Sequence, residues 1–308
     1  MTMATQHLKE ALVRGLLSFP VTHFTADGEF NEAPYRGHIT DLLTYGPAGL
    51  FAAGGTGEFF SLTLTEFGRV IAAAVDAVGR TVPVIAGTGY GTQMAIEFAR
   101  AAQAAGAGGL LVLPHYLLQV EQEGLYRHIA AICRSVDIGV IVYNRDNCIF
   151  GIETLERLAD ACPNLIGFKD GAGNIEQLVS VRQRLGDRLI YVGGMPTAEV
   201  FAVPYKGIGF STYSSAVFNF LPRMARRFFD AVRTDDRETT DRLLRDFFLP
   251  YLGLRNRRRG YAVSIIKAGM RLTGRAAGPV RPPLVDLSAS EEAELSILIR
   301  KVSEKAAR

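Results

Sequence analysis

Lys169 is the residue of this sequence whose type and position most favour covalent chemistry. It directly follows the apolar run LIGF at residues 165–168, whereas the other five lysines fall in expected helices, loops or the terminal tail. Burial at such a position would disfavour the ammonium ion, lower the pKa and leave a neutral amine able to attack a carbonyl carbon. The alternative is a lysine that extends to water or pairs with Asp170.

Tyr143 is the second candidate, because it lies near the end of the preceding apolar run, IGVIVYN at residues 138–144. If the two runs are neighbouring strands, the phenol would lie beside Lys169 and could move protons between an amine adduct and a substrate. The alternative is an amphipathic ring that covers the core and keeps its hydroxyl in water.

The segment GGTGE at residues 54–58 is a candidate binding site for a carboxylate. Its glycines allow a turn in which the backbone N–H groups of Gly55, Thr56 and Gly57 point to one place, and the Thr56 hydroxyl adds a further donor. Phosphate binding is less well supported, since no GxxxxGK[ST] pattern and no basic residue accompany the segment. A tight connection between a strand and a helix would also explain the glycines.

Metal and cofactor chemistry have no recognisable motif in the sequence. The five histidines show no metal-ligand spacing, and the acidic residues form no cluster suited to a divalent ion. We therefore expect neither a metal nor a cofactor, with an iminium ion as the electron sink. The net charge of +3 is too small to indicate nucleic-acid binding, and the cluster of Arg255, Arg257, Arg258 and Arg259 is interpreted as a solvated or interfacial patch.

Eight short apolar runs alternate with longer segments of helical periodicity, which is typical of repeated strand and helix units around a parallel sheet. No GxGxxG pattern follows the first run, so a closed (β/α)8 TIM barrel is favoured over an open doubly wound sheet. Thr65 and Glu66 indicate the start of one helix, and Thr92 and Gly106 the start and end of another. The expected strands are residues 16–24, 48–55, 82–89, 108–114, 138–144, 165–170, 189–194 and 207–214.

The domain organisation follows from the change of pattern after Ser215, where only helical segments remain. We expect a barrel over residues 1–235 and additional C-terminal helices over residues 236–308, packed on the barrel. No long apolar run and no signal peptide occur, so we expect a cytoplasmic protein without membrane contacts. The three cysteines form no CxxC pair and are expected to be reduced.

The three strand-end motifs together resemble the dihydrodipicolinate synthase and N-acetylneuraminate lyase family of class I aldolase-like barrels. The resemblance spans nearly the whole chain, from LLSFPVTHF to about Arg271. It implies that Lys169 in the motif GFK forms a Schiff base with an α-keto acid, and that Tyr143 in the pair YN relays protons. It also implies that the loop at residues 54–58 binds the carboxylate of that keto acid.

Within the family, the chain resembles a branch that dehydrates and decarboxylates a keto sugar acid with two carboxylates, and its departures from the synthase pattern support this placement. Gly55 replaces the first threonine of a GTTGE loop, and Cys148 stands where a synthase has an arginine. The segments that resemble this branch are GGTGEFFSL, YNRDN, GFKDGAGNIE, YSSAVFNF and RRRGYAVSIIKAG.

Further substrate contacts are expected from side chains near the ends of strands. Arg145 could receive the second carboxylate, although a salt bridge with a helix is an alternative. Ser211, with Thr212 and Ser214, could contact substrate hydroxyls, although all three could be turn residues. Tyr116 matches a tyrosine that in family members completes the site of a neighbouring subunit, so the resemblance implies a homotetramer built from two dimers.

Two other functions stay open. An aldolase or lyase of the same family, acting on a 2-keto-3-deoxy sugar acid or pyruvate, would use the same Lys169 and Tyr143. A non-catalytic barrel would bind a keto acid without turnover. Product analysis distinguishes the preferred dehydratase, because it alone releases CO₂ and no pyruvate.

Overall fold

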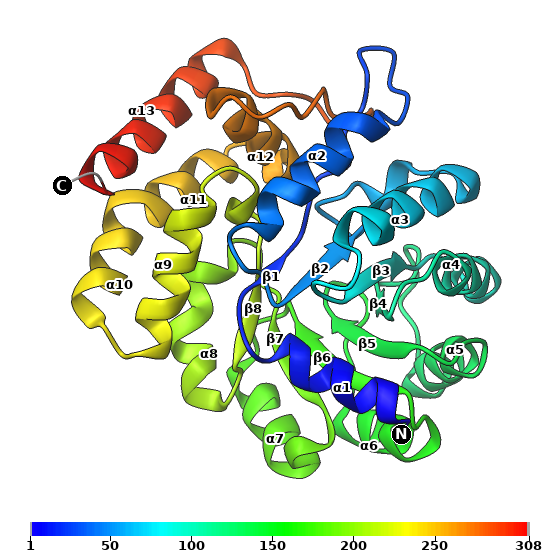
Figure 1. Ribbon diagram of the computed structural model, residues 1–308. Helices are drawn as coiled ribbons and strands as arrows, with labels where there is room; N and C mark the ends of the chain where they lie inside the picture. Colours follow the sequence, from blue (N-terminus) through cyan, green and yellow to red (C-terminus); the bar gives the residue numbers. More distant parts are fainter. Residues whose placement is uncertain (1, 307–308) are drawn as a thin grey trace.

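Eight parallel strands close into a barrel in the computed structural model, which describes residues 2–306 (Figure 1). Each strand pairs with the next, and β8 returns to β1 with Leu17 opposite Ser214. The predicted TIM barrel is therefore confirmed. The strands are β1 (Leu17–Ser18), β2 (Gly49–Ala52), β3 (Val84–Thr88), β4 (Gly109–Val112), β5 (Gly139–Asn144), β6 (Leu165–Asp170), β7 (Ile190–Gly193) and β8 (Thr212–Ser215).

Helices between the strands cover the outside of the barrel (Figure 1). Helix α3 begins at Leu64, one residue before the predicted start at Thr65. The cap is Thr63, whose hydroxyl accepts from the Glu66 amide while the Glu66 carboxylate accepts from the Thr63 amide. Helix α4 starts at Thr92 as predicted and ends before Gly106, which has a φ of 91°. These helices are α2 (Glu32–Leu43), α3 (Leu64–Val78), α4 (Thr92–Ala104), α5 (Gln122–Arg134), α6 (Ile152–Ala161), α7 (Ile175–Leu185) and α8 (Ala202–Ile208).

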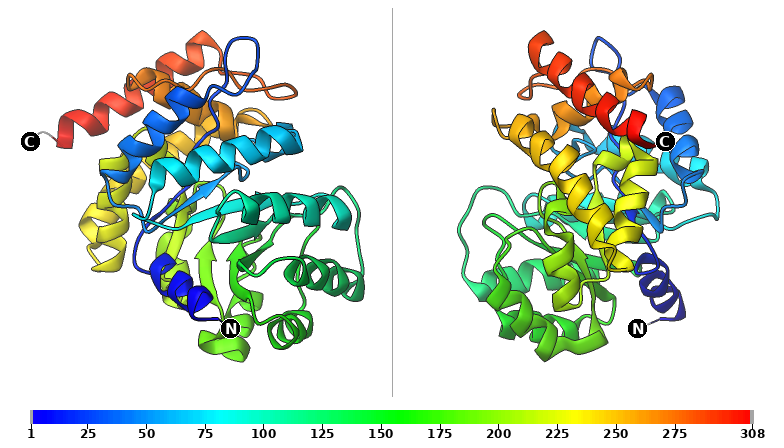
Figure 2. Two further views of the ribbon diagram at one scale, coloured as in Figure 1. Left: turned by 45° about the vertical axis from the view of Figure 1, so that its right-hand side comes forward. Right: turned by 90° about the vertical axis from the view of Figure 1, so that its left-hand side faces the viewer.

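Side chains from the strands fill the barrel, and helix α1 (Met3–Leu12) closes its amino-terminal end (Figure 2). Leu8 and Leu12 of this helix are buried in the same cluster as Phe51, Ile85 and Ile141 from the strands. Because α1 closes the amino-terminal end of the barrel to water, the site must open at the carboxyl ends of the strands.

The eighth strand differs from its predicted bounds. The run that was expected to start it, from Gly207, ends helix α8, and Gly209 follows with a left-handed φ of 102°. The strand therefore begins only at Thr212. A short apolar run does not distinguish the last turn of a helix from a strand, and here the glycine terminates the helix.

Helical segments follow β8 and gather beside the barrel, at the left and along the upper edge of the view (Figure 1). They share a second core with the barrel, in which Phe228, Phe247 and Ile265 pack with Leu16 and Val21. The predicted C-terminal helices are thus present, and the boundary after residue 235 stays a prediction. The segments are α9 (Pro222–Arg233), α10 (Arg237–Leu243), the π-helix η5 (Leu244–Phe248), α11 (Leu249–Arg255), α12 (Tyr261–Leu272) and α13 (Ala289–Ala306).

Two further expectations concern the chain as a whole. Among the helices of residues 2–306, none combines the length and the apolar character needed to cross a membrane. The three cysteines, Cys133, Cys148 and Cys162, are unpaired and buried.

Candidate active site

Lys169 and Tyr143 lie side by side at the carboxyl ends of neighbouring strands. They are direct register partners in the pairing of β5 with β6, and each side chain is only 4% exposed. The Lys169 Nζ lies 4.1 Å from the centre of the Tyr143 ring and 4.4 Å from the centre of the Phe19 ring. The two residues that we singled out independently therefore form one arrangement.

The environment of Lys169 favours the neutral amine. Burial, followed by the positive charge of Arg145, lowers the pKa of Lys169 well below its usual value. Within the described residues, no carboxylate oxygen lies within 4 Å of its Nζ. A buried lysine without a counter-ion is a nucleophile rather than a structural cation.

Asp170, the alternative partner of Lys169, is occupied by other groups. Its carboxylate accepts hydrogen bonds from Asn144 at 2.7 Å, from the Gly173 amide at 2.9 Å and from the Tyr205 hydroxyl at 2.5 Å. Successive side chains of a strand point to opposite faces, so Asp170 faces away from Lys169. The salt bridge considered for Lys169 is not formed.

The Tyr143 hydroxyl is held in place by two partners. It donates to the Gly194 carbonyl at 2.6 Å and accepts from Arg145 Nη1 at 3.2 Å. Burial raises the pKa of Tyr143, so the phenol is protonated at neutral pH. Gly194 must lack a side chain here, because a Cβ would meet the Lys169 side chain at 2.6 Å.

A cavity of about 520 Å³ surrounds these two residues at the mouth of the barrel. Gly55 and Thr56 line it, and their contact with the keto-acid carboxylate stays a prediction. Gly57 is not among the lining residues, because it packs closely under Ala53, where a Cβ would meet backbone at 2.9 Å. Its carbonyl accepts a hydrogen bond from the Thr22 hydroxyl at 2.6 Å.

Glu58 anchors the loop at residues 54–58 to the C-terminal part of the chain, a role that the sequence did not indicate. It adopts a left-handed backbone with a φ of 56° and is fully buried. Its carboxylate pairs with Lys267 of α12 at 2.6 Å and accepts from the Arg281 amide at 2.9 Å. Such a backbone persists only where neighbours enforce it, so the C-terminal helices set the shape of the loop.

Two guanidinium groups enter the same cavity. Arg145 follows β5, and Arg255 ends α11, where it donates to the Thr197 hydroxyl at 3.3 Å. Burial and then the charge of Arg145 lower the pKa of Arg255, which shows that the two cations act on each other. The prediction that Arg255 belongs to a solvated or interfacial patch is wrong, because Arg255 lines the cavity. Arg257 does lie at the surface, where it pairs with the exposed Glu294 at 2.6 Å.

Ser211 is not part of the site, which corrects our expectation. It is exposed and precedes β8, at the amino-terminal end of the strands and thus opposite the cavity. Thr212 at the same end donates to the Gly15 carbonyl. Ser214, two residues later, does line the cavity.

Glu199 also lines the cavity and was missed by the sequence analysis. It belongs to the 3-10 helix η3 (Ala198–Phe201), is 1% exposed and accepts from the Ser215 hydroxyl at 2.6 Å. Burial raises its pKa to about 7. No sequence motif indicates Glu199, because it is a candidate proton donor only as a result of its burial in the folded chain.

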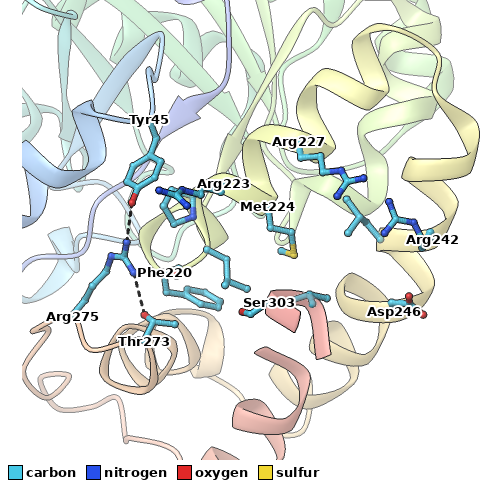
Figure 3. A pocket seen from close by; sticks show the side chains of 14 residues that line it. Tyr45, Phe220, Arg223, Met224, Arg227, Arg242, Asp246, Thr273, Arg275 and Ser303 are labelled. Atoms are coloured by element: carbon cyan, nitrogen blue, oxygen red, sulfur yellow. Dashed lines mark hydrogen bonds between the residues drawn. The ribbon is translucent and has the colours of Figure 1, made fainter. Parts of the chain in front are cut away.

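A second and larger cavity, of about 640 Å³, lies between α9, α10, α12 and α13 (Figure 3). Arginines line it, with Arg223 and Arg275 near Tyr45 and with Arg227 and Arg242 farther along. No lysine lines it, so it offers no amine for a Schiff base.

No group of three or more His, Cys, Asp or Glu that could hold a metal ion occurs in the described part of the chain.

Comparison with known proteins decides the family. The model of the dihydrodipicolinate synthetase family matches residues 12–302. The chain belongs to this family. A protein from Xanthobacter autotrophicus called probable 5-dehydro-4-deoxyglucarate dehydratase is 59% identical over 96% of this chain and 98% of its own length. The 5-dehydro-4-deoxyglucarate dehydratase of Pseudomonas putida is 54% identical over 97% and 99%.

Solved structures of the dihydrodipicolinate synthetase family share the fold. Dihydrodipicolinate synthase from Bacillus clausii has a TM-score of 0.88 and 28% identity, covering 96% of this chain and 99% of its own. A prophage protein of the family from E. coli K12, in complex with pyruvate, has a TM-score of 0.84 and 28% identity, covering 94% and 98%. The family resemblance inferred from the motifs is therefore confirmed, as is the expectation of an enzyme of the dehydratase branch.

Proposed function

We propose that this chain catalyses the decarboxylating dehydration of 5-dehydro-4-deoxyglucarate to 2,5-dioxopentanoate, CO₂ and water. The observation that carries the proposal is the buried Lys169 amine, which has no counter-ion and lies against Tyr143 in an open cavity. The names of the relatives supply the substrate, and the geometry supplies the means to react with its keto group.

In the first step Lys169 attacks the C5 ketone and loses water to form an iminium ion. The positive nitrogen acidifies the C4 proton, and the Tyr143 hydroxyl lies where it can relay protons between the adduct and C4. Its bonds to Gly194 and Arg145 orient the phenol beside the amine. Loss of the C4 proton gives an enamine.

The enamine then expels the C3 hydroxyl and becomes a conjugated iminium ion. This ion accepts the electron pair released when the C1 carboxylate leaves as CO₂. Protonation, tautomerisation and hydrolysis release the product and regenerate Lys169. One covalent electron sink thus serves both the dehydration and the decarboxylation.

The two carboxylates of the substrate have separate partners in this proposal. Gly55 and Thr56 hold the carboxylate next to the keto group through backbone N–H groups and a hydroxyl. Arg145 and Arg255 face the other end, where two neighbouring cations are stabilised by a bound anion. An aldolase acting on a monocarboxylate would not need the two arginines.

Assembly into a homotetramer of two dimers is part of the proposal. The loop after β4 exposes apolar side chains beside the cavity, with Tyr116 at 65%, Leu117 at 76% and Leu118 at 67%. Exposed apolar groups of this size favour burial against another subunit. Light scattering of the wild type and of Leu117→Asp tests this, since a shift to smaller particles is expected only if the loop lies in an interface.

We also propose that the protein resides in the cytoplasm, in keeping with its free cysteines.

Product analysis tests the reaction. Purified protein is incubated with 5-dehydro-4-deoxyglucarate, and CO₂, 2,5-dioxopentanoate and pyruvate are measured. Equal amounts of CO₂ and 2,5-dioxopentanoate are expected. Pyruvate without CO₂ would identify an aldolase, and binding without any product would identify a non-catalytic barrel.

A further inference from the structure

Glu199 is a buried acid of the catalytic cavity that the steps above do not use. Its Oε1 accepts from the Ser215 hydroxyl at 2.6 Å, while its Oε2 is buried without a hydrogen-bond partner. A buried carboxylate anion with an unsatisfied oxygen costs more free energy than the neutral acid does. The local structure therefore favours the protonated form of Glu199 in the cavity that contains Lys169 and Tyr143.

The charges around Glu199 support the protonated form. No lysine or arginine nitrogen lies within 4 Å of its carboxyl group in the described part of the chain. Burial and then the carboxyl group of Glu199 raise the pKa of the phenols of Tyr213 on β8 and Tyr251 on α11, so both phenols are neutral at pH 7. Burial raises the pKa of Glu199 to about 7, even though the hydrogen bond from Ser215 lowers it.

The position of Glu199 complements that of Tyr143. Lys169 lies on β6, which pairs with β5 on one side and with β7 on the other. Tyr143 comes from β5, whereas Glu199 follows β7 and borders the same cavity. Tyr143 and Glu199 therefore come from the strand on one side of β6 and from the connection after the strand on its other side, and both line the cavity that contains Lys169.

We propose that Glu199 is the catalytic acid that protonates the departing C3 hydroxyl. The inference rests on the proposed function. As the C3–O bond breaks, its electron pair stays on oxygen, which takes the Glu199 proton and leaves as water, while the enamine electrons form the C3–C4 double bond. Glu199 is then reprotonated from water, in agreement with the one proton that the whole reaction consumes when it converts a dianion into a monoanion, CO₂ and water.

Glu199→Gln tests the assignment, because the amide keeps the size and the bond to Ser215 but cannot supply the proton. We expect kcat for CO₂ release to fall by about 100-fold or more. The steps before dehydration should survive, so borohydride should still trap the adduct on Lys169, and the C4 protons should still exchange with D₂O. Glu238→Gln, at an exposed position of α10, is the matched control and should behave like the wild type.

The pH profile supplies a readout that a structural role would not change. Wild-type kcat should decline as the pH rises above about 7, where Glu199 loses its proton. Glu199→Asp keeps a carboxylic acid and should show such a decline too. This variant keeps the test available if Glu199→Gln does not fold. CO₂ release within a few-fold of the wild type in Glu199→Gln, or parallel loss of exchange and CO₂ release, would overturn the inference. A wild type without adduct and without CO₂ would instead refute the proposed function.

Discussion

Two cavities of the molecule differ in what their charged groups can do. The larger one, of about 640 Å³, has four arginines on its walls, and two of them, Arg223 and Arg227, are exposed to water. The smaller one, of about 520 Å³, contains a lysine that is 4% exposed. Exposed guanidinium groups are permanently charged and inert as nucleophiles, whereas a buried lysine becomes a neutral amine.

This contrast shows that neither volume nor the number of charges identifies the reaction site. What distinguishes the smaller cavity is the burial of groups that titrate, with Lys169, Tyr143 and Glu199 all shifted toward their neutral forms. Perturbed pKa values of this kind gather at functional sites. Substitutions in the two cavities should therefore have very different effects.

The largest effect is expected from Lys169→Met. The substitution removes the amine while keeping an apolar chain of similar length, so the fold should tolerate it. Without a Schiff base, kcat should fall by about 10⁴-fold or more. Steady-state CO₂ release measures this, and activity within 100-fold of the wild type would contradict the assignment.

A smaller loss is expected from Tyr143→Phe. The ring would keep its contact with Lys169, but the hydroxyl that bonds Gly194 and Arg145 would be lost. Removal of a proton relay should lower kcat by about 10² to 10⁴-fold. If Lys169 adducts form and turn over at the wild-type rate, the phenol is only a packing residue.

Arg255→Gln should act on substrate recognition. Loss of one charge-assisted hydrogen bond costs roughly 1.5 to 3 kcal/mol, or about 10 to 150-fold in kcat/KM. The loss should be large for the dicarboxylate and small for pyruvate as an adduct-forming ligand. Equal losses with both compounds would place Arg255 outside the site of the second carboxylate.

Arg145→Gln should move the pH dependence. The positive charge of Arg145 lowers the pKa of Lys169, so its removal raises that pKa and keeps the amine protonated to higher pH. The acid limb of kcat/KM should therefore shift toward higher pH relative to the wild type. A shift toward lower pH, or none, would show that Arg145 does not influence the amine.

The smallest effect is expected in the larger cavity. Arg227→Gln should leave kcat/KM within about twofold of the wild type, because exposed substitutions usually change stability by less than ~0.5 kcal/mol. It is the matched control for Arg255→Gln. A loss comparable to that of Arg255→Gln would break the distinction between the two cavities.

The sequence predicted the parts of this molecule that depend on local pattern. The barrel, Lys169 and Tyr143 follow from apolar runs and the polar residues that end them. Ser211 was misplaced because the last turn of α8 has the composition of a strand, and the terminating Gly209 decides between them. Arg255, Glu199 and the Glu58–Lys267 pair could not be predicted, since their roles depend on contacts between residues far apart in the chain.

Borohydride reduction in the presence of 5-dehydro-4-deoxyglucarate tests the central claim most directly. Wild-type protein is reduced with and without substrate, and the modified peptide is identified by mass spectrometry. We predict a substrate-dependent adduct on Lys169 alone. The absence of an adduct, or an adduct on any of the other five lysines, would contradict the proposed mechanism.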